Sequence, residues 1–417
     1  MDIITVPSKP SGSIKAIPSK SQAHRLLICA ALCKKPTRLI IDSLSEDIEA
    51  TMGCLKAIGV EIQREGNCFT VIPPEKYTLS PALDCGESGS TLRFMLPVVC
   101  ALCGKADFDG HGRLPLRPMT QLVDEMEKHG VSFSSKKLPF STSGNMCGGD
   151  FTLPGNISSQ YITGLLLALP LLEQSSRITI TTRLESSAYV DITLDALSMF
   201  GVKAQKNANS YIIEKDCRYI SPESLTVEGD WSNAAFFIAL GTLCGGISVT
   251  GLNTASVQGD KNIISHLKKM GAEFEIRGDE IIPQKCSLHG CVIDISETPD
   301  LLPILAVVAA FAQGQTRFVN GERLRLKESD RLKTTCAMLN SLGGVCEETA
   351  DGLTIEGKAL TGGTVDGAND HRIVMAAAIA AFLCKGDVTI TGAQAVNKSY
   401  PDFFEDYNKL GGKANVI

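Results

Sequence analysis

Basic side chains recur at short polar turns of this chain, and their type suits the binding of small anions. Guanidinium groups bind carboxylate and phosphate through paired hydrogen bonds, and ammonium groups bind them as compact charges. The chain as a whole is acidic, with a net charge of −6, so a concentration of cations at its turns indicates a specific role for them. We therefore expect a site for a small polyanion, although each cation taken alone is also typical of a solvated surface. The cations at the turns are Lys20, Arg25, Arg93, Arg113, Arg117, Lys327, Arg331, Arg372 and Lys398.

Two carboxylates stand beside these cations and suit proton transfer. Asp300 precedes Leu-Leu-Pro at a predicted helix start, and Glu328 lies between Lys327 and Arg331. A carboxylate near cations and a ligand can take a hydroxyl proton as a general base. An aspartate at a helix start is as often only an N-cap, so Asp300 has both interpretations. The same choice between capping and ligand binding applies to the hydroxyls of Ser158-Ser-Gln-Tyr161.

Other catalytic patterns are missing from the sequence. It contains no GxxxxGK[ST] or HExxH segment and no Gly-x-Ser-x-Gly at a strand–helix turn, and its six histidines have no metal-ligand spacing. The fifteen cysteines include Cys100 and Cys103, which lie in an apolar stretch. Reduced core thiols are the main interpretation of this pair, and a metal or redox role is the alternative. We expect no metal and no cofactor.

Six repeats of about 70 residues must position the polar side chains. One marker is a polar turn that leads into an apolar helix, at Arg25, Arg93, Gln160, Asn233, Pro303 and Arg372. A second marker with the same period is a glycine that caps the end of an amphipathic helix, at Gly59, Gly130, Gly201, Gly271, Gly343 and Gly411. Two independent markers with one period predict a structural repeat. Several helix starts that face one place would add backbone N–H groups to the cations.

Each repeat reads as βαβαββ, which predicts an α/β protein. The first helix of a repeat, as at residues 25–33, is apolar nearly all round, so we expect it to be buried with the sheets outside. Six such units favour two domains of three units each, with a junction near residues 225–230. The strand at residues 3–6 has no unit before it, and we expect it to complete the second domain.

Composition indicates a globular chain without a membrane or nucleic-acid partner. The 417 residues are 44% hydrophobic and 21% charged, and the acidic balance speaks against a nucleic-acid surface. No stretch reaches the roughly 18–20 apolar residues of a membrane span, and residues 1–7 do not resemble a signal peptide. We expect a cytoplasmic protein.

Seven motifs, in order, make the whole chain resemble the 5-enolpyruvylshikimate-3-phosphate synthase (3-phosphoshikimate 1-carboxyvinyltransferase) family of enolpyruvyl transferases. The resemblance implies transfer of the carboxyvinyl group of phosphoenolpyruvate to the 5-hydroxyl of shikimate 3-phosphate, with release of phosphate, on the shikimate pathway to chorismate. It also implies a monomeric enzyme and glyphosate as an inhibitor. The motifs are Lys20-Ser-Gln-Ala-His-Arg25, Gly86-Glu-Ser-Gly-Ser-Thr-Leu-Arg93, Arg113-Leu-Pro-Leu-Arg-Pro118, Ser158-Ser-Gln-Tyr161, Lys327-Glu-Ser-Asp-Arg331, Asn369-Asp-His-Arg372 and Lys398-Ser-Tyr-Pro-Asp402.

The resemblance assigns ligands and catalytic groups residue by residue. Asp300 would accept the 5-hydroxyl proton, and Glu328 or Lys20 would move the proton at C3 in an addition–elimination reaction. The cations would stabilise the phosphate and carboxylate charges. The implied ligands of shikimate 3-phosphate are Lys20, Ser21, Arg25, Ser158, Ser159, Gln160, Ser186, Asp300 and Lys327. Those of phosphoenolpyruvate are Lys20, Gly89, Arg117, Gln160, Arg331, Arg372 and Lys398.

The fold that the resemblance implies is an inside-out α/β barrel: two similar domains, each of three βαβαββ units with buried helices and outer sheets. The active site would lie in the cleft between the domains, which would close on the substrates. One domain would comprise residues 1–12 and 228–417 and carry mainly the phosphoenolpyruvate-side Arg and Lys residues with Asp300 and Glu328. Residues 13–227 would carry much of the shikimate 3-phosphate site.

Three positions depart from the family pattern. Pro18-Ser-Lys20 lacks the glycine that is usual between proline and serine, which would change the loop around Lys20. Glu87 stands where asparagine is common, and its charge would alter the affinity for phosphoenolpyruvate and for glyphosate. Arg323 replaces an asparagine that contacts the shikimate phosphate in some members.

Two rival functions remain open from the sequence. The sister family transfers the same group to UDP-N-acetylglucosamine and usually has a cysteine in a mobile loop near residues 110–117. This chain has no cysteine between Gly104 and Met146. A non-catalytic phosphometabolite-binding protein of the same fold would bind ligands without releasing phosphate, and it would not need Lys20, Asp300 and Glu328.

Overall fold

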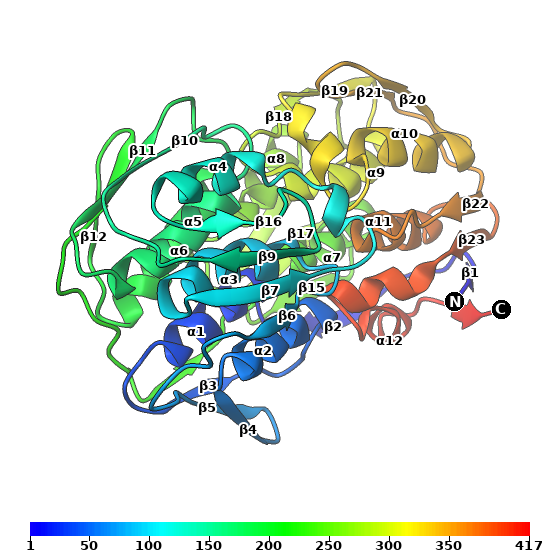
Figure 1. Ribbon diagram of the computed structural model, residues 1–417. Helices are drawn as coiled ribbons and strands as arrows, with labels where there is room; N and C mark the ends of the chain where they lie inside the picture. The colour runs from blue at the N-terminus through cyan, green and yellow to red at the C-terminus, as the bar shows by residue number, and fades with distance from the viewer. The chain divides into compact units, whose positions relative to one another are not determined.

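Six four-stranded sheets with one common strand order make up the computed structural model, which describes residues 1–417 (Figure 1). Contacts between Cα atoms divide the chain into two compact units, Met1–Ile17 with Glu228–Ile417, and Pro18–Val227. In every sheet the first two strands run parallel, the third strand pairs with the second in antiparallel fashion, and the fourth pairs with the third in antiparallel fashion. The six sheets are therefore copies of one βαβαββ arrangement.

The unit Pro18–Val227 contains three of the sheets. Their strands, in sheet order, are β14 (Ser224–Thr226), β3 (Thr37–Ile40), β5 (Cys68–Ile72) and β4 (Glu61–Glu65) in the first; β6 (Ala82–Asp84), β7 (Lys105–Asp109), β9 (Phe140–Ser143) and β8 (Ser132–Phe133) in the second; and β10 (Asp150–Leu153), β11 (Ser176–Ile180), β13 (Ser210–Ile213) and β12 (Ala204–Lys206) in the third. The helices of this unit are α1 (Lys20–Ala31), α2 (Glu46–Ala57), α3 (Gly89–Leu102), α4 (Thr120–Lys128), α5 (Ser159–Ala168) and α6 (Ser187–Met199), with the short helices η1 (Leu114–Leu116) and η2 (Leu169–Leu171).

The discontinuous unit contains the other three sheets. Their strands are β2 (Gly12–Lys15), β15 (Ile247–Thr250), β17 (Glu280–Gln284) and β16 (Glu273–Arg277); β18 (Val292–Asp294), β19 (Gln315–Val319), β21 (Leu353–Glu356) and β20 (Val345–Glu348); and β22 (Gly363–Asp366), β23 (Val388–Thr391), β1 (Ile3–Thr5) and β24 (Ala414–Val416). Its helices are α7 (Trp231–Cys244), α8 (Ile263–Lys269), α9 (Leu302–Phe311), α10 (Arg331–Ser341), α11 (His371–Ala381) and α12 (Phe403–Lys409), with the short helices η3 (Gly259–Asn262), η4 (Pro299–Leu301), η5 (Glu322–Leu326) and η6 (Ala393–Lys398).

The first helix of each repeat is buried, as its apolar sequence predicts. Every residue of α11 is buried, and α9 has only Phe311 partly exposed. Helices α1, α3 and α5 form the core of one unit, and α7, α9 and α11 form the core of the other. Because these first helices are apolar on all sides, they pack against one another inside each unit, and the sheets cover them on the outside.

Side-chain caps fix where most of these buried helices begin. The side chains of Ser19, Ser88 and Ser158 accept hydrogen bonds from backbone N–H groups in the first turns of α1, α3 and α5. Asp230 and Asp370 do the same for α7 and α11. These caps pair N–H groups that a helix start would otherwise leave without partners.

A glycine with positive φ follows the second helix in all six repeats, which confirms the predicted caps. These glycines are Gly59, Gly130, Gly201, Gly271, Gly343 and Gly411, with φ between 76° and 101°. A residue with a side chain rarely adopts this conformation, so glycine ends the helix without strain.

Three strands complete sheets far from their neighbours in sequence. Strand β2 pairs with β15 in parallel, from Gly12 opposite Ile247 to Lys15 opposite Thr250. Strand β14 pairs with β3, and β1 lies between β23 and β24. The sequence placed the first boundary after residue 12. The observed boundary lies after Ile17, because β2 belongs to the sheet of β15.

The helices are short. The longest, α3 and α7, have 14 residues each. None is both long and apolar enough to cross a bilayer, which takes about 20 residues.

Candidate active site

The residues singled out in the sequence lie in the connections that leave one edge of each sheet, either on the loops or in the first turn of the helix that follows. The loops that follow two parallel strands leave the same edge, so each sheet places two loops side by side. One kind of connection leads into a first helix, and this loop or the first turn of the helix carries Lys20, Gly89, Ser158, Asp300 and Arg372. The other kind enters a second helix and carries Arg117, Ser186, Lys327, Glu328 and Lys398.

In the unit Pro18–Val227, two guanidinium groups gather over the start of α3. A methyl group built on Gly89 would lie 2.5 Å from Nη1 of Arg117 and 2.6 Å from Nη1 of Arg93. Glycine is therefore required for these cations to lie against the first turn of the helix. The arrangement joins two positive charges to the N-terminal end of a helix dipole, which suits an anion.

Gln160 ties this group to the start of α5. Its Oε1 accepts a hydrogen bond of 2.9 Å from Nη1 of Arg93, and its Nε2 donates to Oγ of Ser90 at 3.0 Å. Nη2 of Arg93 donates to the carbonyl of Pro118 at 3.0 Å, and Tyr161 donates to the same carbonyl at 2.5 Å. The loop that carries Arg117 is thus fastened to both helices.

Lys20 opens α1 and pairs with a carboxylate that sequence reasoning missed. Its Nζ lies 2.7 Å from Oδ2 of Asp47 at the start of α2. The carbonyl of Asp47 accepts a hydrogen bond from Oγ1 of Thr91 at 3.3 Å, which links α2 to α3. Asp47 lies at the start of the second helix of its repeat. The other repeats also have polar residues at this point, so the repeat period could have identified Asp47.

Arg25 is largely committed to the fold. It is buried, and its guanidinium donates to Oγ1 of Thr193 and of Thr163 and to the carbonyls of Ser21 and Tyr189. These four bonds use four of its five N–H groups, which leaves at most one for a ligand. Burial lowers the pKa of Arg25. Its predicted role in binding shikimate 3-phosphate remains a prediction.

The remaining predicted site residues of this unit are three serines and Arg113. Ser158 caps α5, and its side chain accepts from N of Gln160 at 3.3 Å. Ser159 is buried. Ser186 is buried with φ of 52°, a left-handed conformation that is strained for serine and that clusters at functional sites in proteins. Arg113 is exposed. We call Gly89, Arg93, Arg117 and Gln160, which the contacts described above join, the Gly89 cluster.

In the discontinuous unit, Arg331 holds three carboxylates. Its Nε lies 2.8 Å from Oδ2 of Asp370, its Nη1 2.6 Å from Oδ1 of Asp300, and its Nη2 2.6 Å from Oε2 of Glu328. The side chain is 1% exposed. Burial acts to lower the pKa of Arg331, but Asp370, Glu328 and Asp300 together raise it well above its usual value.

Asp300 contacts two further cations. Its Oδ1 lies 3.2 Å from Nζ of Lys327, and its Oδ2 lies 3.3 Å from Nη2 of Arg372. The short helix η4 positions Asp300 ahead of α9, where no side chain caps the helix, so the carboxylate is directed to the cations instead. Asp300 thus contacts cations in this structure, and its role as a general base stays a prediction. Burial lowers the pKa of Lys327, and Asp300 opposes this effect.

Asp370 caps the start of α11, and the neighbouring Asn369 contacts Lys398, the last of the predicted cations. Asp370 is fully buried, and its Oδ1 accepts from N of Arg372 at 3.0 Å. The carbonyl of Asn369, a residue with φ of 51°, accepts from Nζ of Lys398 at 2.8 Å. We call Asp300, Lys327, Glu328, Arg331, Asp370, Arg372 and Lys398 the Arg331 cluster.

Asp260 adds a carboxyl group to this cluster, and sequence reasoning did not find it. It is 3% exposed in η3, at the start of a second helix, as Asp47 is in the first repeat. Burial and the charge of Asp300 raise the pKa of Asp260 to about 6, while Arg372 acts in the opposite direction. Its place in the repeat is the signal that would have identified it.

Glu87 contacts the loop that carries Arg117. A methyl group built on Gly112 would collide with the Glu87 carboxylate, so the two are in close contact. Gly112 has φ of 56°, which favours glycine at this point. Glu87 therefore contacts the Gly110–Arg117 loop, and its effect on affinity for phosphoenolpyruvate stays a prediction.

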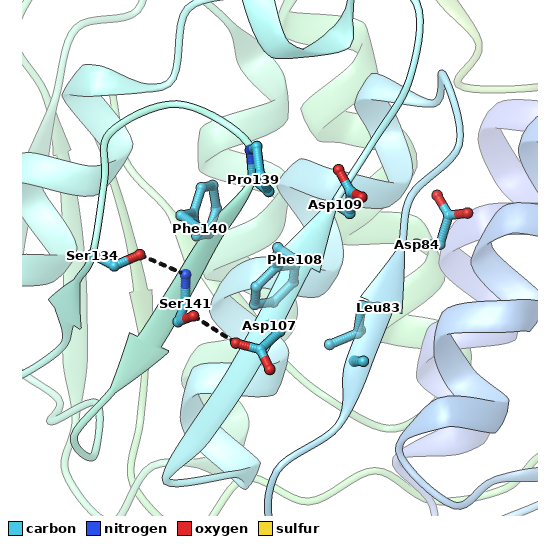
Figure 2. A pocket seen from close by; sticks show the side chains of 10 residues that line it. Leu83, Asp84, Asp107, Phe108, Asp109, Ser134, Pro139, Phe140 and Ser141 are labelled. Atoms are coloured by element: carbon cyan, nitrogen blue, oxygen red, sulfur yellow. Dashed lines mark hydrogen bonds between the residues drawn. The ribbon is translucent and has the colours of Figure 1, made fainter.

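A separate pocket of about 480 Å³ lies over strands β6, β7 and β9 (Figure 2). Asp84, Asp107 and Asp109 line it, and no Lys or Arg is among the ten lining residues. Oγ of Ser141 donates to Asp107 at 2.5 Å within it. This carboxylate-lined surface repels anions, so it is not the site for which the basic turns are arranged.

The chain matches known proteins along nearly its whole length. Residues 4–407 match the family described as EPSP synthase (3-phosphoshikimate 1-carboxyvinyltransferase). The chain belongs to the EPSP synthase family. The predicted family and enzyme class, a transferase of the shikimate pathway for aromatic amino-acid biosynthesis, are therefore confirmed.

Relatives and a solved structure agree with the EPSP synthase assignment. The chain is 43% identical to the 3-phosphoshikimate 1-carboxyvinyltransferase of Clostridium novyi, over 99% of this chain and 98% of that protein. It is 44% identical to the enzyme of the same name from Clostridium acetobutylicum, over 96% of this chain and 95% of that protein. A solved EPSP synthase structure from Acinetobacter baumannii covers all of both chains with a TM-score of 0.81 and 25% identity. The predicted fold class, two similar units with buried helices, is confirmed.

Proposed function

We propose that this EPSP synthase family member transfers the carboxyvinyl group of phosphoenolpyruvate to the 5-hydroxyl of shikimate 3-phosphate, with Asp300 as general base. The observation that carries the proposal is the placement of the Asp300 carboxylate among Arg331, Lys327 and Arg372. Its side chain is 14% exposed, so a ligand can reach it. A carboxylate held among anion-binding cations is the combination that this reaction needs.

Shikimate 3-phosphate is the proposed ligand of a group of serines and cations. Hydroxyls at a helix start and the adjacent backbone N–H groups suit a phosphate, which supports Ser158, Ser159 and the strained Ser186 as its ligands. The proposed ligands are Lys20, Ser21, Arg25, Ser158, Ser159, Gln160, Ser186, Asp300 and Lys327.

Phosphoenolpyruvate is the proposed ligand of the guanidinium groups. The bare Cα of Gly89 supports close approach of a small anion to Arg117, and Arg331 and Arg372 supply paired donors for a carboxylate or phosphate. The proposed ligands are Lys20, Gly89, Arg117, Gln160, Arg331, Arg372 and Lys398.

The reaction follows as an addition and an elimination. Asp300 takes the 5-hydroxyl proton while the oxygen attacks C2 of phosphoenolpyruvate, and Glu328 or Lys20 gives a proton to C3. Phosphate then leaves as a proton departs from C3 and the double bond re-forms. The cations stabilise the charge on the phosphate and carboxylate groups throughout.

The proposal extends to the enzyme's setting. We propose a monomer, since one chain supplies every assigned ligand, and a cytoplasmic location, which fifteen cysteine thiols support. Glyphosate, which carries a carboxylate and a phosphonate, would compete at the phosphoenolpyruvate ligands.

Phosphate release from the purified protein tests the function. We expect release only when phosphoenolpyruvate and shikimate 3-phosphate are both present. Release without shikimate 3-phosphate, or no release while both ligands bind in titrations, would contradict the proposal.

A further inference from the structure

The guanidinium group of Arg331 has two edges that can hold a carboxylate through paired hydrogen bonds. Asp370 occupies the edge formed by Nε and Nη2, with distances of 2.8 Å and 3.3 Å. Asp370 is fully buried and also accepts bonds from Ser329 and from N of Arg372. A ligand carboxylate can therefore form paired bonds only with the edge formed by Nη1 and Nη2.

That second edge is already in use. The remaining hydrogen of Nη2 points to Oε2 of Glu328 at 2.6 Å, since Asp370 uses the other one. Nη1 contacts Asp300 at 2.6 Å but carries a second hydrogen, so Asp300 can keep its contact when a ligand binds. A ligand that pairs with this edge must therefore displace Glu328.

Glu328 is also the carboxylate best able to move. Its side chain is 24% exposed, against 14% for Asp300 and none for Asp370. It lies in the loop between η5 and α10, and its side chain has one methylene group more than an aspartate. Displacement costs least where a group returns to water instead of leaving a buried partner unpaired.

We propose that the carboxylate of phosphoenolpyruvate replaces Glu328 on Arg331, and that this exchange releases Glu328 for the proton transfer at C3. The inference rests on the proposed function, in which Arg331 binds phosphoenolpyruvate. Arg331 keeps a counter-ion at every stage, because one carboxylate takes the place of another.

The exchange also explains how Glu328 obtains a proton to give. A carboxylate paired with a guanidinium group stays ionised, and separation from that cation favours protonation. Glu328 would take a proton from water after release, pass it to C3 during addition, and take one back from C3 during elimination. Binding of the correct anion thus prepares the proton donor.

Titration of phosphoenolpyruvate into Glu328→Gln tests the exchange. The protein would be saturated with a shikimate 3-phosphate analogue that lacks the 5-hydroxyl group, so that no turnover occurs. We expect phosphoenolpyruvate to bind about three- to tenfold more tightly than to the unmodified protein, because its competitor for Arg331 is weakened. With the natural substrates, kcat should fall about a hundredfold.

Asp330→Asn is the matched control. It removes the same charge two residues away, but Asp330 pairs with Arg325, and asparagine keeps the cap of α10. We expect less than a twofold change in the dissociation constant for this variant. Equal tightening in both variants would show a general charge effect and would overturn the exchange.

A crystal structure of the ternary complex gives a second readout. The exchange requires Oε2 of Glu328 to lie beyond hydrogen-bond distance of Nη2 of Arg331. Weaker or unchanged binding by Glu328→Gln, or an intact pair in the complex, would overturn the inference while the proposed function stands. Failure of the unmodified protein to bind phosphoenolpyruvate would instead contradict the site proposal.

Discussion

Oδ1 of Asp300 lies 2.6 Å from Nη1 of Arg331, so the proposed general base and a proposed ligand of phosphoenolpyruvate share a hydrogen bond. The same oxygen lies 3.2 Å from Nζ of Lys327. A change at Asp300 therefore alters the proton acceptor and leaves its cations with less negative charge nearby.

Asp300→Asn should lower kcat by about 10²–10⁴-fold, the usual contribution of a general base. Binding of the two anionic substrates should not weaken, because the variant removes a negative charge from a basic cluster. Steady-state kinetics and calorimetric titrations measure the two effects. Near-normal turnover would remove Asp300 from the role of base.

Gly89→Ala should raise the KM for phosphoenolpyruvate at least tenfold. The added methyl group would lie 2.5 Å and 2.6 Å from guanidinium nitrogens of Arg117 and Arg93, so at least one must shift. The KM for shikimate 3-phosphate should change less than threefold. Gly53→Ala, where a methyl group meets nothing within 4 Å, is the control and should leave both values unchanged. Equal increases in both KM values would contradict the assignment of Gly89.

Arg25→Lys should destabilise the protein by about 2–4 kcal/mol. A lysine cannot reproduce the planar fork that donates to Thr193, Thr163 and the carbonyl of Tyr189, and buried acceptors would lose their partners. The midpoint of urea unfolding measures this loss. Arg218→Lys, at an exposed position, should leave the midpoint unchanged. A midpoint for Arg25→Lys equal to that of the unmodified protein would show that the fork is dispensable.

Asp370→Asn should destabilise the discontinuous unit by about 3 kcal/mol, because it weakens a buried pair with Arg331. The cap of α11 survives, since asparagine also caps helices. Thermal unfolding measures the effect. Asp124→Asn breaks an exposed pair with Lys136 and should change stability by less than about 1 kcal/mol. Similar losses in the two variants would refute the special role of the buried pair.

Asp260 should make stability depend on pH. Burial and the charge of Asp300 raise the pKa of Asp260 to about 6 in the folded protein, well above its ordinary value, so the folded state binds the proton more tightly than the unfolded state. The contribution of Asp260 to the free energy of unfolding is fully present below about pH 4 and is lost as pH rises through 6. The loss amounts to at most about 3 kcal/mol. Asp260→Asn should therefore flatten the fall in the urea midpoint between pH 4.5 and 7.5.

The control for Asp260 is Asp150→Asn, at an exposed position on β10. That variant should show the same pH dependence as the unmodified protein. A fall in the midpoint of Asp260→Asn as steep as that of the unmodified protein would show that other groups cause it.

The repeat and its caps were predictable because they depend on local chemistry. Polar turns before apolar helices and glycines after amphipathic ones repeat with one period, and both features appear in the structure. Strand β2 precedes α1 but pairs with β15, and β14 precedes α7 but pairs with β3. These pairings were not predictable, since either strand suits either sheet by propensity and pattern. Only the tertiary fold decides between equivalent partners.

The residue types of the candidate site were predictable from the sequence, but the hydrogen bonds and ion pairs between those residues were not. Basic residues at turns indicated an anion site, but sequence could not reveal that Arg25 is taken up by backbone carbonyls or that Arg331 holds three carboxylates. Those properties depend on which residues distant in sequence meet. Asp47 and Asp260 could have been predicted from the repeat, because both lie at the start of a second helix.

The place of β1 between β23 and β24 has a consequence for how the chain is made. A ribosome produces Ile3–Thr5 long before the partner strands at Val388–Thr391 and Ala414–Val416. The unit Pro18–Val227 can finish its three sheets once Thr226 has emerged, while β1 must wait for both of its partner strands. One unit can thus complete its sheets earlier in synthesis than the other.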